Sequence, residues 1–262
     1  AGTLNINSST ALGANSSTFT IAGGTIDNTS AGSITLANNN PMLWNGDFTY
    51  VGTQALNLGT GNVTLSATRQ VTTGAGNLTV GGIISGAGFG LTKAGAGMLT
   101  LGAVTNTFSG VTTINEGVLS IPAASALNAT TGITISGTSD LLPATLQYTG
   151  TGTTTLPTTA NIALGGNDRA NIIEVSSATA ILQLGSSKIL TGGNAAGTSL
   201  LKTGPGIFGT QANTGSASST MVGATRILNG TIRCTPATAG TRSSRSQTTS
   251  SSATGSTSTS TI

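Results

Sequence analysis

Residues 81–121, GGIISGAGFGLTKAGAGMLTLGAVTNTFSGVTTINEGVLSI, decide the fold expected for this chain. Short runs of alternating apolar and polar residues are separated there by turns of Gly, Ala, Asn and Ser. Glycine falls every few residues and the apolar positions follow a period of two, so the pattern excludes a helix and predicts strands. These strands are expected at residues 90–93, 98–101, 111–114 and 118–121.

A weaker copy of the pattern begins at Leu200, as LLKTGPGIF followed by ATRILNGTI. The shared positions are the lysine and the glycines: Lys93, Gly95 and Gly97 align with Lys202, Gly204 and Gly206, and Gly117 aligns with Gly230. Between them, the first copy has an aromatic NTFSG turn that ends at Gly110, and the second copy lacks it. A unit that recurs in this way is typical of one coil in a stack rather than of a catalytic site.

These residues resemble a known family, the passenger-associated (or autotransporter-associated) β-strand repeat of secreted bacterial proteins. The motifs that carry the resemblance are LTKAGAGMLTL at residues 91–101, NTFSG at 106–110 and TTINEGVLSI at 112–121. The resemblance implies a right-handed parallel β-helix, or β-solenoid, in a bacterial protein that is secreted or displayed on the cell surface. It implies no catalytic activity.

The rest of the chain favours one continuous architecture. Pairs of apolar residues separated by a single residue recur from Leu4 and Ile6 to Leu182 and Leu184. Since alternate side chains of a strand point to opposite faces, each apolar pair is expected inside and the residue between them outside. The pattern therefore predicts an all-β solenoid over the whole body of the chain.

Two segments depart from this pattern. The less regular sequence at residues 140–157 is expected to form an extended loop or a bulged coil. A Ser/Thr-rich tail at residues 234–262 has too few apolar residues to order itself. We therefore expect a solenoid body at residues 1–233, followed by this low-complexity tail.

The composition excludes several functional classes. Of the 262 residues, 6% are charged and 3% are aromatic, there is no histidine, and the net charge is +3. So few basic residues, without interleaved aromatics, argue against a nucleic-acid surface. No run of eighteen apolar residues is present, so no membrane-spanning helix is expected. Cys234 is the single cysteine, which excludes an internal disulfide, and a Cys–His pair is impossible.

Catalytic chemistry has little support in the sequence. A polysaccharide lyase or hydrolase needs acidic side chains that converge on one site, and the nearest candidates are Asp168, Arg169 and Glu174. Solvated turn charges explain these residues more simply. No catalytic residue, cofactor or metal site is therefore expected, and Lys93 and Lys202 are interpreted as markers of a turn.

The region around the only tryptophan allows two interpretations. Trp44 and Tyr50 are expected to pack a corner of the solenoid, because aromatic side chains mostly serve as packing. The alternative is an exposed contact on which a carbohydrate or a host surface stacks.

The functional hypothesis is a non-enzymatic, secreted structural protein. Because no polar cap is recognisable, its solenoid ends are expected to associate with other copies, as in a filament or a surface layer. The alternatives are an adhesin passenger that binds carbohydrate or a host surface, and a polysaccharide-degrading enzyme. A β-sandwich pilin that donates a strand to its neighbour is the rival architecture.

Overall fold

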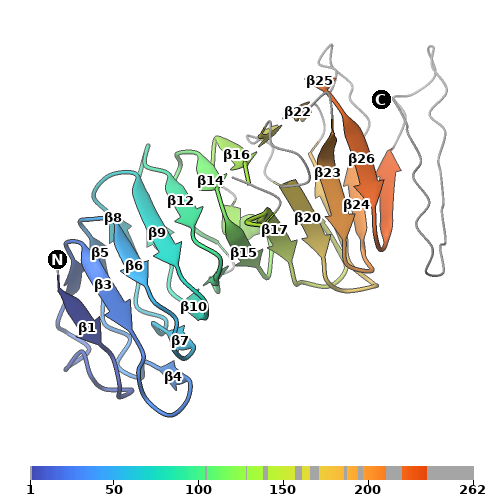
Figure 1. Ribbon diagram of the computed structural model, residues 1–262. Coiled ribbons are helices and arrows are strands. Elements are labelled where there is room, and N and C mark those ends of the chain that lie inside the picture. The colour runs from blue at the N-terminus through green and yellow to red at the C-terminus, as the bar shows by residue number, and fades with distance from the viewer. Residues whose placement is uncertain are drawn as a thin grey trace.

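The computed structural model is a stack of parallel strands wound into a β-solenoid (Figure 1). It describes residues 2–103, 105–127, 129–137, 141–156, 161–165, 171–185, 188–193, 197–210 and 220–234. The all-β solenoid expected from the sequence is confirmed, and the one helical element in these residues is a short 3-10 turn, η1 (Ala124–Leu127). The expected tail lies outside the described residues from residue 235 onward.

Two long sheets form two faces of the solenoid. Sheet 1 has ten strands, β1 (Thr3–Asn5), β3 (Gly24–Asp27), β6 (Phe48–Tyr50), β9 (Arg69–Thr73), β12 (Leu91–Ala94), β14 (Thr112–Ile114), β16 (Gly132–Ile135), β19 (Asn161–Leu164), β22 (Leu190–Gly192) and β25 (Thr220–Met221). Sheet 2 has nine strands, β4 (Ile34–Thr35), β7 (Leu56–Asn57), β10 (Asn77–Val80), β13 (Met98–Leu101), β15 (Gly117–Ile121), β17 (Ala144–Tyr148), β20 (Asn171–Val175), β23 (Thr198–Thr203) and β26 (Ala224–Ile227).

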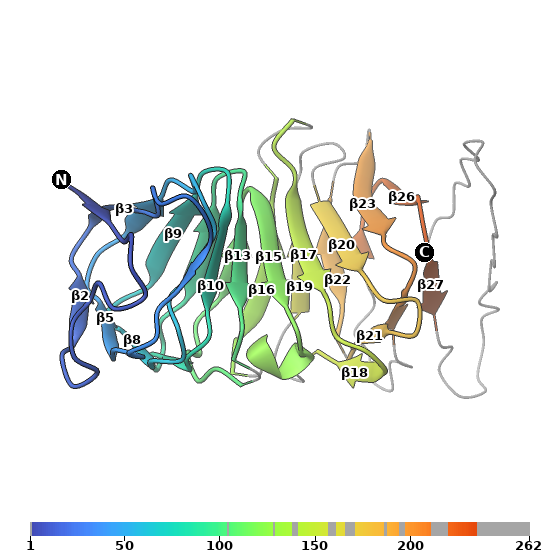
Figure 2. The same ribbon diagram turned by 90° about the horizontal axis from the view of Figure 1, so that it is seen from below.

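The third face is divided between two shorter sheets. Sheet 3 contains β2 (Phe19–Ile21), β5 (Met42–Trp44), β8 (Val63–Leu65) and β11 (Ile84–Ser85). Sheet 4 contains β18 (Thr153–Thr155), β21 (Ile181–Leu184), β24 (Ile207–Thr210) and β27 (Thr231–Cys234). Figure 2 shows η1 on the same side of the molecule as β8 and β18, where it takes the place of a strand. We call the turns that connect one sheet to the next corners.

Neighbouring coils are joined by parallel pairing, and the number of residues per coil changes along the chain. Leu91 pairs with Thr112, which lies 21 residues later, whereas Ile133 pairs with Ile162, which lies 29 residues later. The N-terminal coils are thus short and the later ones longer, with the extra residues at the corners. The four strands expected within residues 81–121 are observed as β12 to β15, each within one residue of its expected bounds at either end.

Apolar side chains stack inside the solenoid from coil to coil. In sheet 2 the inward ladder contains Leu56, Leu78, Leu99, Leu119, Leu146 and Ile173, all buried. The expectation that the apolar pairs face inward is thereby confirmed along the stack. Leu4 is an exception, with 42% of its surface exposed, because its strand β1 pairs on one side only in the described chain.

Of the two expectations for residues 140–157, an extended loop or a bulged coil, the structure shows a coil in the described residues 141–156. Two strands, β17 and β18, lie within it, and Leu146, Tyr148 and Leu156 are buried. The five residues of β17 pair in full with both β15 and β20. The loop alternative was wrong because neighbouring coils impose an extended backbone on a segment whose own Thr and Gly content is typical of turns.

One buried hydroxyl allows a test of the core. Thr73 is fully buried, and its Oγ1 has no hydrogen-bond partner within the described residues. Thr73→Val is expected to raise the free energy of unfolding by about 1 kcal/mol, because it replaces an unpaired buried hydroxyl with a methyl group. Chemical denaturation measures this change. Thr112→Val is the matched control: this buried hydroxyl lies 3.2 Å from the Thr130 Oγ1, so its loss should destabilise the fold. Destabilisation by both variants would contradict the prediction.

Candidate functional site

A buried lysine lies at the corner between β12 and β13. Lys93 is 0% exposed, although its residue type is rarely buried. Its Nζ donates hydrogen bonds to the carbonyl oxygens of Ala94 (2.9 Å), Gly95 (2.6 Å) and Glu116 (3.0 Å). Glu116 belongs to the next coil, between β14 and β15. One ammonium group thus ties the turns of two successive coils together.

Lys202 repeats this arrangement near the C-terminal end of the described body. It is also 0% exposed, and its Nζ donates to the carbonyl oxygens of Thr203, Gly204 (2.8 Å) and Asn229 (3.4 Å). As with Lys93, two acceptors directly follow the lysine and the third belongs to the next coil. The aligned lysines therefore have the same local structure.

The aligned glycines allow the two turns to approach each other. Gly117 has φ +66°, and a Cβ there would lie 2.4 Å from the carbonyl oxygen of Gly95. Gly230 has φ +77°, and its Cβ would lie 2.4 Å from the carbonyl oxygen of Gly204. The remaining motif glycines, Gly97, Gly110 and Gly206, also lie against backbone atoms of the preceding coil.

The two lysine corners occupy different places in the coil. Lys93 is the penultimate residue of a strand of sheet 1 and precedes a strand of sheet 2, whereas Lys202 is the penultimate residue of a strand of sheet 2 and precedes a strand of sheet 4. The sequence repeat is therefore a repeat of a corner rather than of a whole coil. The two corners share a local sequence pattern, so their different places in the coil are set by the strands on which each corner stacks.

Burial changes the acidity of both lysines. Loss of solvent lowers the pKa of Lys93 from 10.5 to about 7, and the negative charge of Glu116 opposes this shift. The Glu116 carboxylate also accepts a hydrogen bond from the Gly95 backbone N–H, at 3.2 Å. Burial likewise lowers the pKa of Lys202 to about 8, opposed by the charge of Glu174.

The lowered pKa of Lys93 predicts a pH dependence of stability. Between about pH 7 and 10.5 the unfolded chain keeps a proton that the folded chain has lost, so stability rises with pH in this window. The slope is at most about 1.4 kcal/mol per pH unit for one group. Denaturation of the wild type and Lys93→Met from about pH 6 to about pH 9 isolates this contribution. The stability difference between them is expected to shift in favour of the wild type as pH rises; a constant difference would refute the prediction.

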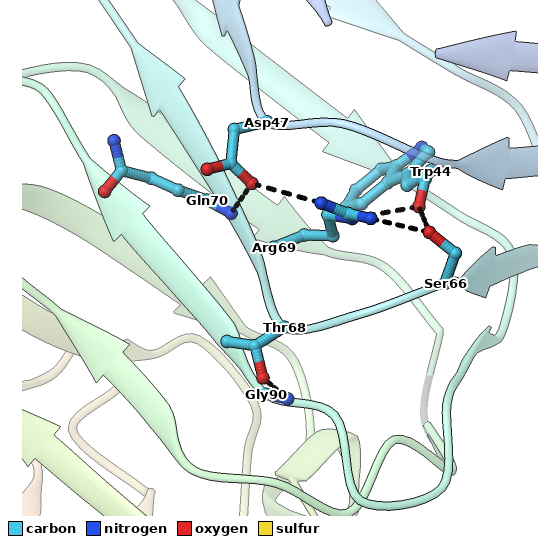
Figure 3. A network of polar contacts seen from close by, with 7 residues as sticks. All are labelled: Trp44, Asp47, Ser66, Thr68, Arg69, Gln70 and Gly90. Carbon is cyan, nitrogen blue, oxygen red and sulfur yellow. Dashed lines mark hydrogen bonds and ion pairs between the residues drawn. The ribbon is translucent and has the colours of Figure 1, made fainter. Parts of the chain in front are cut away.

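A second polar network lies at the corner that leads from sheet 3 to sheet 1 (Figure 3). Arg69 donates to the carbonyl oxygen of Trp44 (3.2 Å) and to the Ser66 hydroxyl (2.6 Å). Its Nη1 lies 3.9 Å from the Asp47 Oδ1, which also accepts a hydrogen bond from the Gln70 backbone N–H at 2.9 Å. The Asp47 side chain is 61% exposed and that of Arg69 is 16% exposed. The network holds the corners of two coils in place.

Trp44 and Tyr50 are both 0% exposed, which corrects the alternative of a surface contact at these residues. The Trp44 ring packs edge-on against Phe48, with ring centroids 5.1 Å apart. The Tyr50 hydroxyl donates to the carbonyl oxygen of Gln54, and burial together with the Asp27 charge raises its pKa to about 12. Both rings lie inside because they occupy inward positions of β5 and β6.

Buried asparagines and one aspartate were missed by sequence analysis. Asn106 accepts from the Ile84 N–H (2.8 Å) and donates to the Ala126 carbonyl (2.9 Å), so its amide joins three coils. Asn171 is also buried and donates to the carbonyl oxygen of Ser199 in the next coil (3.0 Å). Asp27 accepts from the backbone N–H groups of Gly52 and Thr53. In a chain rich in Asn and Thr, composition offers no signal that separates these residues from exposed ones.

Of the three enzymatic candidates, only Glu174 is described by the structure. Glu174 accepts hydrogen bonds from Gln147 (3.2 Å) and Ser176 (2.9 Å). Asp168 and Arg169 lie outside the described residues. No group of three or more His, Cys, Asp or Glu side chains that would hold a metal is found among the residues with described positions.

Residues 91–121 match the family model of the passenger-associated-transport-repeat. The match runs from β12 to the end of β15 and includes Lys93, Gly95, Gly97, Gly110 and Gly117, so the resemblance noted from the sequence is confirmed there. No curated protein and no solved structure matches the chain. Within the described residues there is no helix with the length and apolar character needed to span a membrane.

Proposed function

We propose that this chain is the rigid, non-catalytic shaft of a passenger-type protein that is secreted or displayed on a bacterial surface. The observation that carries the proposal is the place of the matched repeat, residues 91–121, within the solenoid. Its distinctive residue, Lys93, is buried and bonded to backbone carbonyls, so this lysine builds the shaft and does not present its amine to solvent. The fold and the repeat together support a passenger-type surface protein.

The outer face of sheet 1 suits such a shaft. Threonines lie in register on successive strands, as the series Thr25, Thr49 and Thr72 and the series Thr92, Thr113 and Thr134. Threonine combines strong strand preference with an uncharged polar surface. Such ladders stiffen the rod and need no ligand.

We further propose that copies associate end to end. In the described chain β1 and β25 each pair with a strand of sheet 1 on one side only. The free edge of a parallel strand presents N–H and C=O groups that another strand can pair with. The end strand of a second copy would pair with this edge and continue the stack of coils.

Electron microscopy and light scattering over a range of concentrations test this assembly. Rods of constant width that lengthen with concentration are expected, and rods of unchanging length would contradict end-to-end association. Thr3→Pro is the variant designed to block pairing at the free edge of β1. The bonds from Thr25 N to Gly2 O and from Ile6 N to Asp27 O turn alternate peptide groups of β1 toward β3, so the Thr3 N–H faces outward. Proline there should shorten the rods without lowering stability.

Adhesion is the alternative function, and the exposed polar corner is the observation that favours it. With Trp44 and Tyr50 in the core, a carbohydrate would have to be held by polar groups, such as the exposed Asp47 and Gln70 beside Arg69. A glycan array distinguishes the functions. Binding that Gln70→Ala abolishes would support an adhesin, and the absence of binding would favour a shaft.

A further inference from the structure

The outer face of sheet 2 breaks the pattern seen on sheet 1. Residues directly opposite one another on successive strands form a single outward column: Asn77, Met98, Val118, Thr145, Ile172, Leu201 and Arg226. They point outward because each lies next to a buried inward residue such as Leu99, Leu119 or Ile173. Four of the five central positions carry large apolar side chains, and the fifth, Thr145, is buried, with 6% of its surface exposed.

These apolar side chains are not enclosed by the fold. Met98, Val118, Ile172 and Leu201 all remain partly exposed, whereas their inward neighbours are buried. A single outward apolar residue is common, but two adjacent pairs of them in one column, on either side of Thr145, indicate a contact surface.

Two exposed leucines lie near the middle strand of the row in the sequence. Leu141 is 90% exposed and Leu142 is 37% exposed, and Pro143 separates them from β17, the strand that holds Thr145. Leu141 is the most exposed large apolar side chain of the described chain.

The order of residues in the column is symmetric about Thr145. Two apolar residues lie on each side of it, and a polar residue closes each end. A two-fold axis through Thr145 would set Met98 against Leu201, and Val118 against Ile172, of a second copy. Such isologous contacts are the commonest form of association between identical chains.

We propose that this surface binds a second copy of the chain side by side, with the two solenoids antiparallel. Charge is compatible with this packing. The neighbouring outward column contains Thr100, Ser120, Gln147, Glu174 and Thr203, so its single charge would face an uncharged position of the other copy. This lateral contact is independent of the proposed end-to-end stacking and uses a different surface.

The size of the surface predicts a weak contact. The seven strands from β10 to β26 span about 29 Å at ~4.8 Å per strand, and strands of about five residues are about 17 Å long. This flat area of roughly 500 Å² per copy falls below the roughly 800 Å² per partner of a standard interface. Dimerisation is therefore expected at micromolar concentrations rather than as an obligate state.

Sedimentation velocity over a range of concentrations tests the proposal. The wild type is expected to dimerise, and Ile172→Thr combined with Leu201→Thr should weaken the dimer at least about tenfold, because apolar area is lost while strand preference is kept. Ile181→Thr with Ile207→Thr makes the same change on the outer face of sheet 4, where these two residues are in register, and should have no effect. A monomeric wild type, or equal weakening by both double variants, would overturn the proposal.

Cysteine crosslinking tests the two-fold axis directly. A short bis-maleimide is applied in a Cys234→Ser background to variants at Met98 and Leu201, because Thr145 on the axis is only 6% exposed. Met98→Cys should not link to itself but should link to Leu201→Cys when the two variants are mixed. Self-linking of Met98→Cys would exclude the antiparallel arrangement. Thr3→Pro should leave all these results unchanged, so failure of end-to-end stacking and failure of the lateral contact can be told apart.

Discussion

Gly117→Ala is expected to lower the free energy of unfolding by about 4 kcal/mol. The added Cβ would lie 2.4 Å from the carbonyl oxygens of both Gly95 and Gly97, and these backbone atoms cannot move without disturbing the preceding coil. Left-handed backbone, here with φ +66°, costs a non-glycine residue about 1–2 kcal/mol, and overpacking adds about 1–3 kcal/mol. Denaturation in guanidinium chloride measures the loss.

Gly152→Ala separates these two causes. Gly152 has nearly the same backbone conformation, with φ +71°, but nothing lies within 4 Å of the position of its added Cβ. This variant should lose only about 1–2 kcal/mol, from the left-handed backbone alone. Equal losses in both variants would show that close stacking of the corner turns contributes nothing.

Lys93→Met is expected to lower the free energy of unfolding by about 3 kcal/mol at neutral pH. Methionine fills a similar volume but leaves the carbonyl oxygens of Ala94, Gly95 and Glu116 without the ammonium donor. A buried acceptor left unpaired costs about 1–3 kcal/mol, and relief from burying a charge offsets part of the sum. The same denaturation experiment measures it.

Two further lysine variants define the cause of that loss. Lys202→Met removes an ammonium with the same three-carbonyl arrangement and should also destabilise the fold. Lys188→Met removes a partly exposed lysine from the corner region after β21, and it should change stability by less than about 0.5 kcal/mol. If Lys93→Met proved as mild as Lys188→Met, the buried ammonium would not be holding the two coils together.

Much of the fold could be predicted from the sequence because its signals are local. Alternation of apolar residues sets which side chains face inward, and closely spaced glycines set the turns, as at β12 to β15. The lysine and glycine spacing also identified the passenger-associated repeat, which residues 91–121 match. These features depend on a few neighbouring residues and on no partner elsewhere in the chain.

Contacts between coils could not be predicted in this way. Sequence analysis interpreted Lys93 as a turn marker, and only the structure shows its ammonium bonded to Glu116, in the next coil. The same stacking placed Trp44 and Tyr50 in the core and made β17 a strand. It also aligned Met98 and Leu201 in one outward column.

The sequence by itself therefore determined the four strands of residues 81–121, the turns between them and the solenoid class. Tertiary structure decided which corner each lysine occupies, which polar groups are buried and which surface is apolar. The physical reason is that paired residues lie 20 to 29 positions apart, with a step that changes along the chain. Neighbours across coils depend on that changing step, and a local pattern carries no information about it.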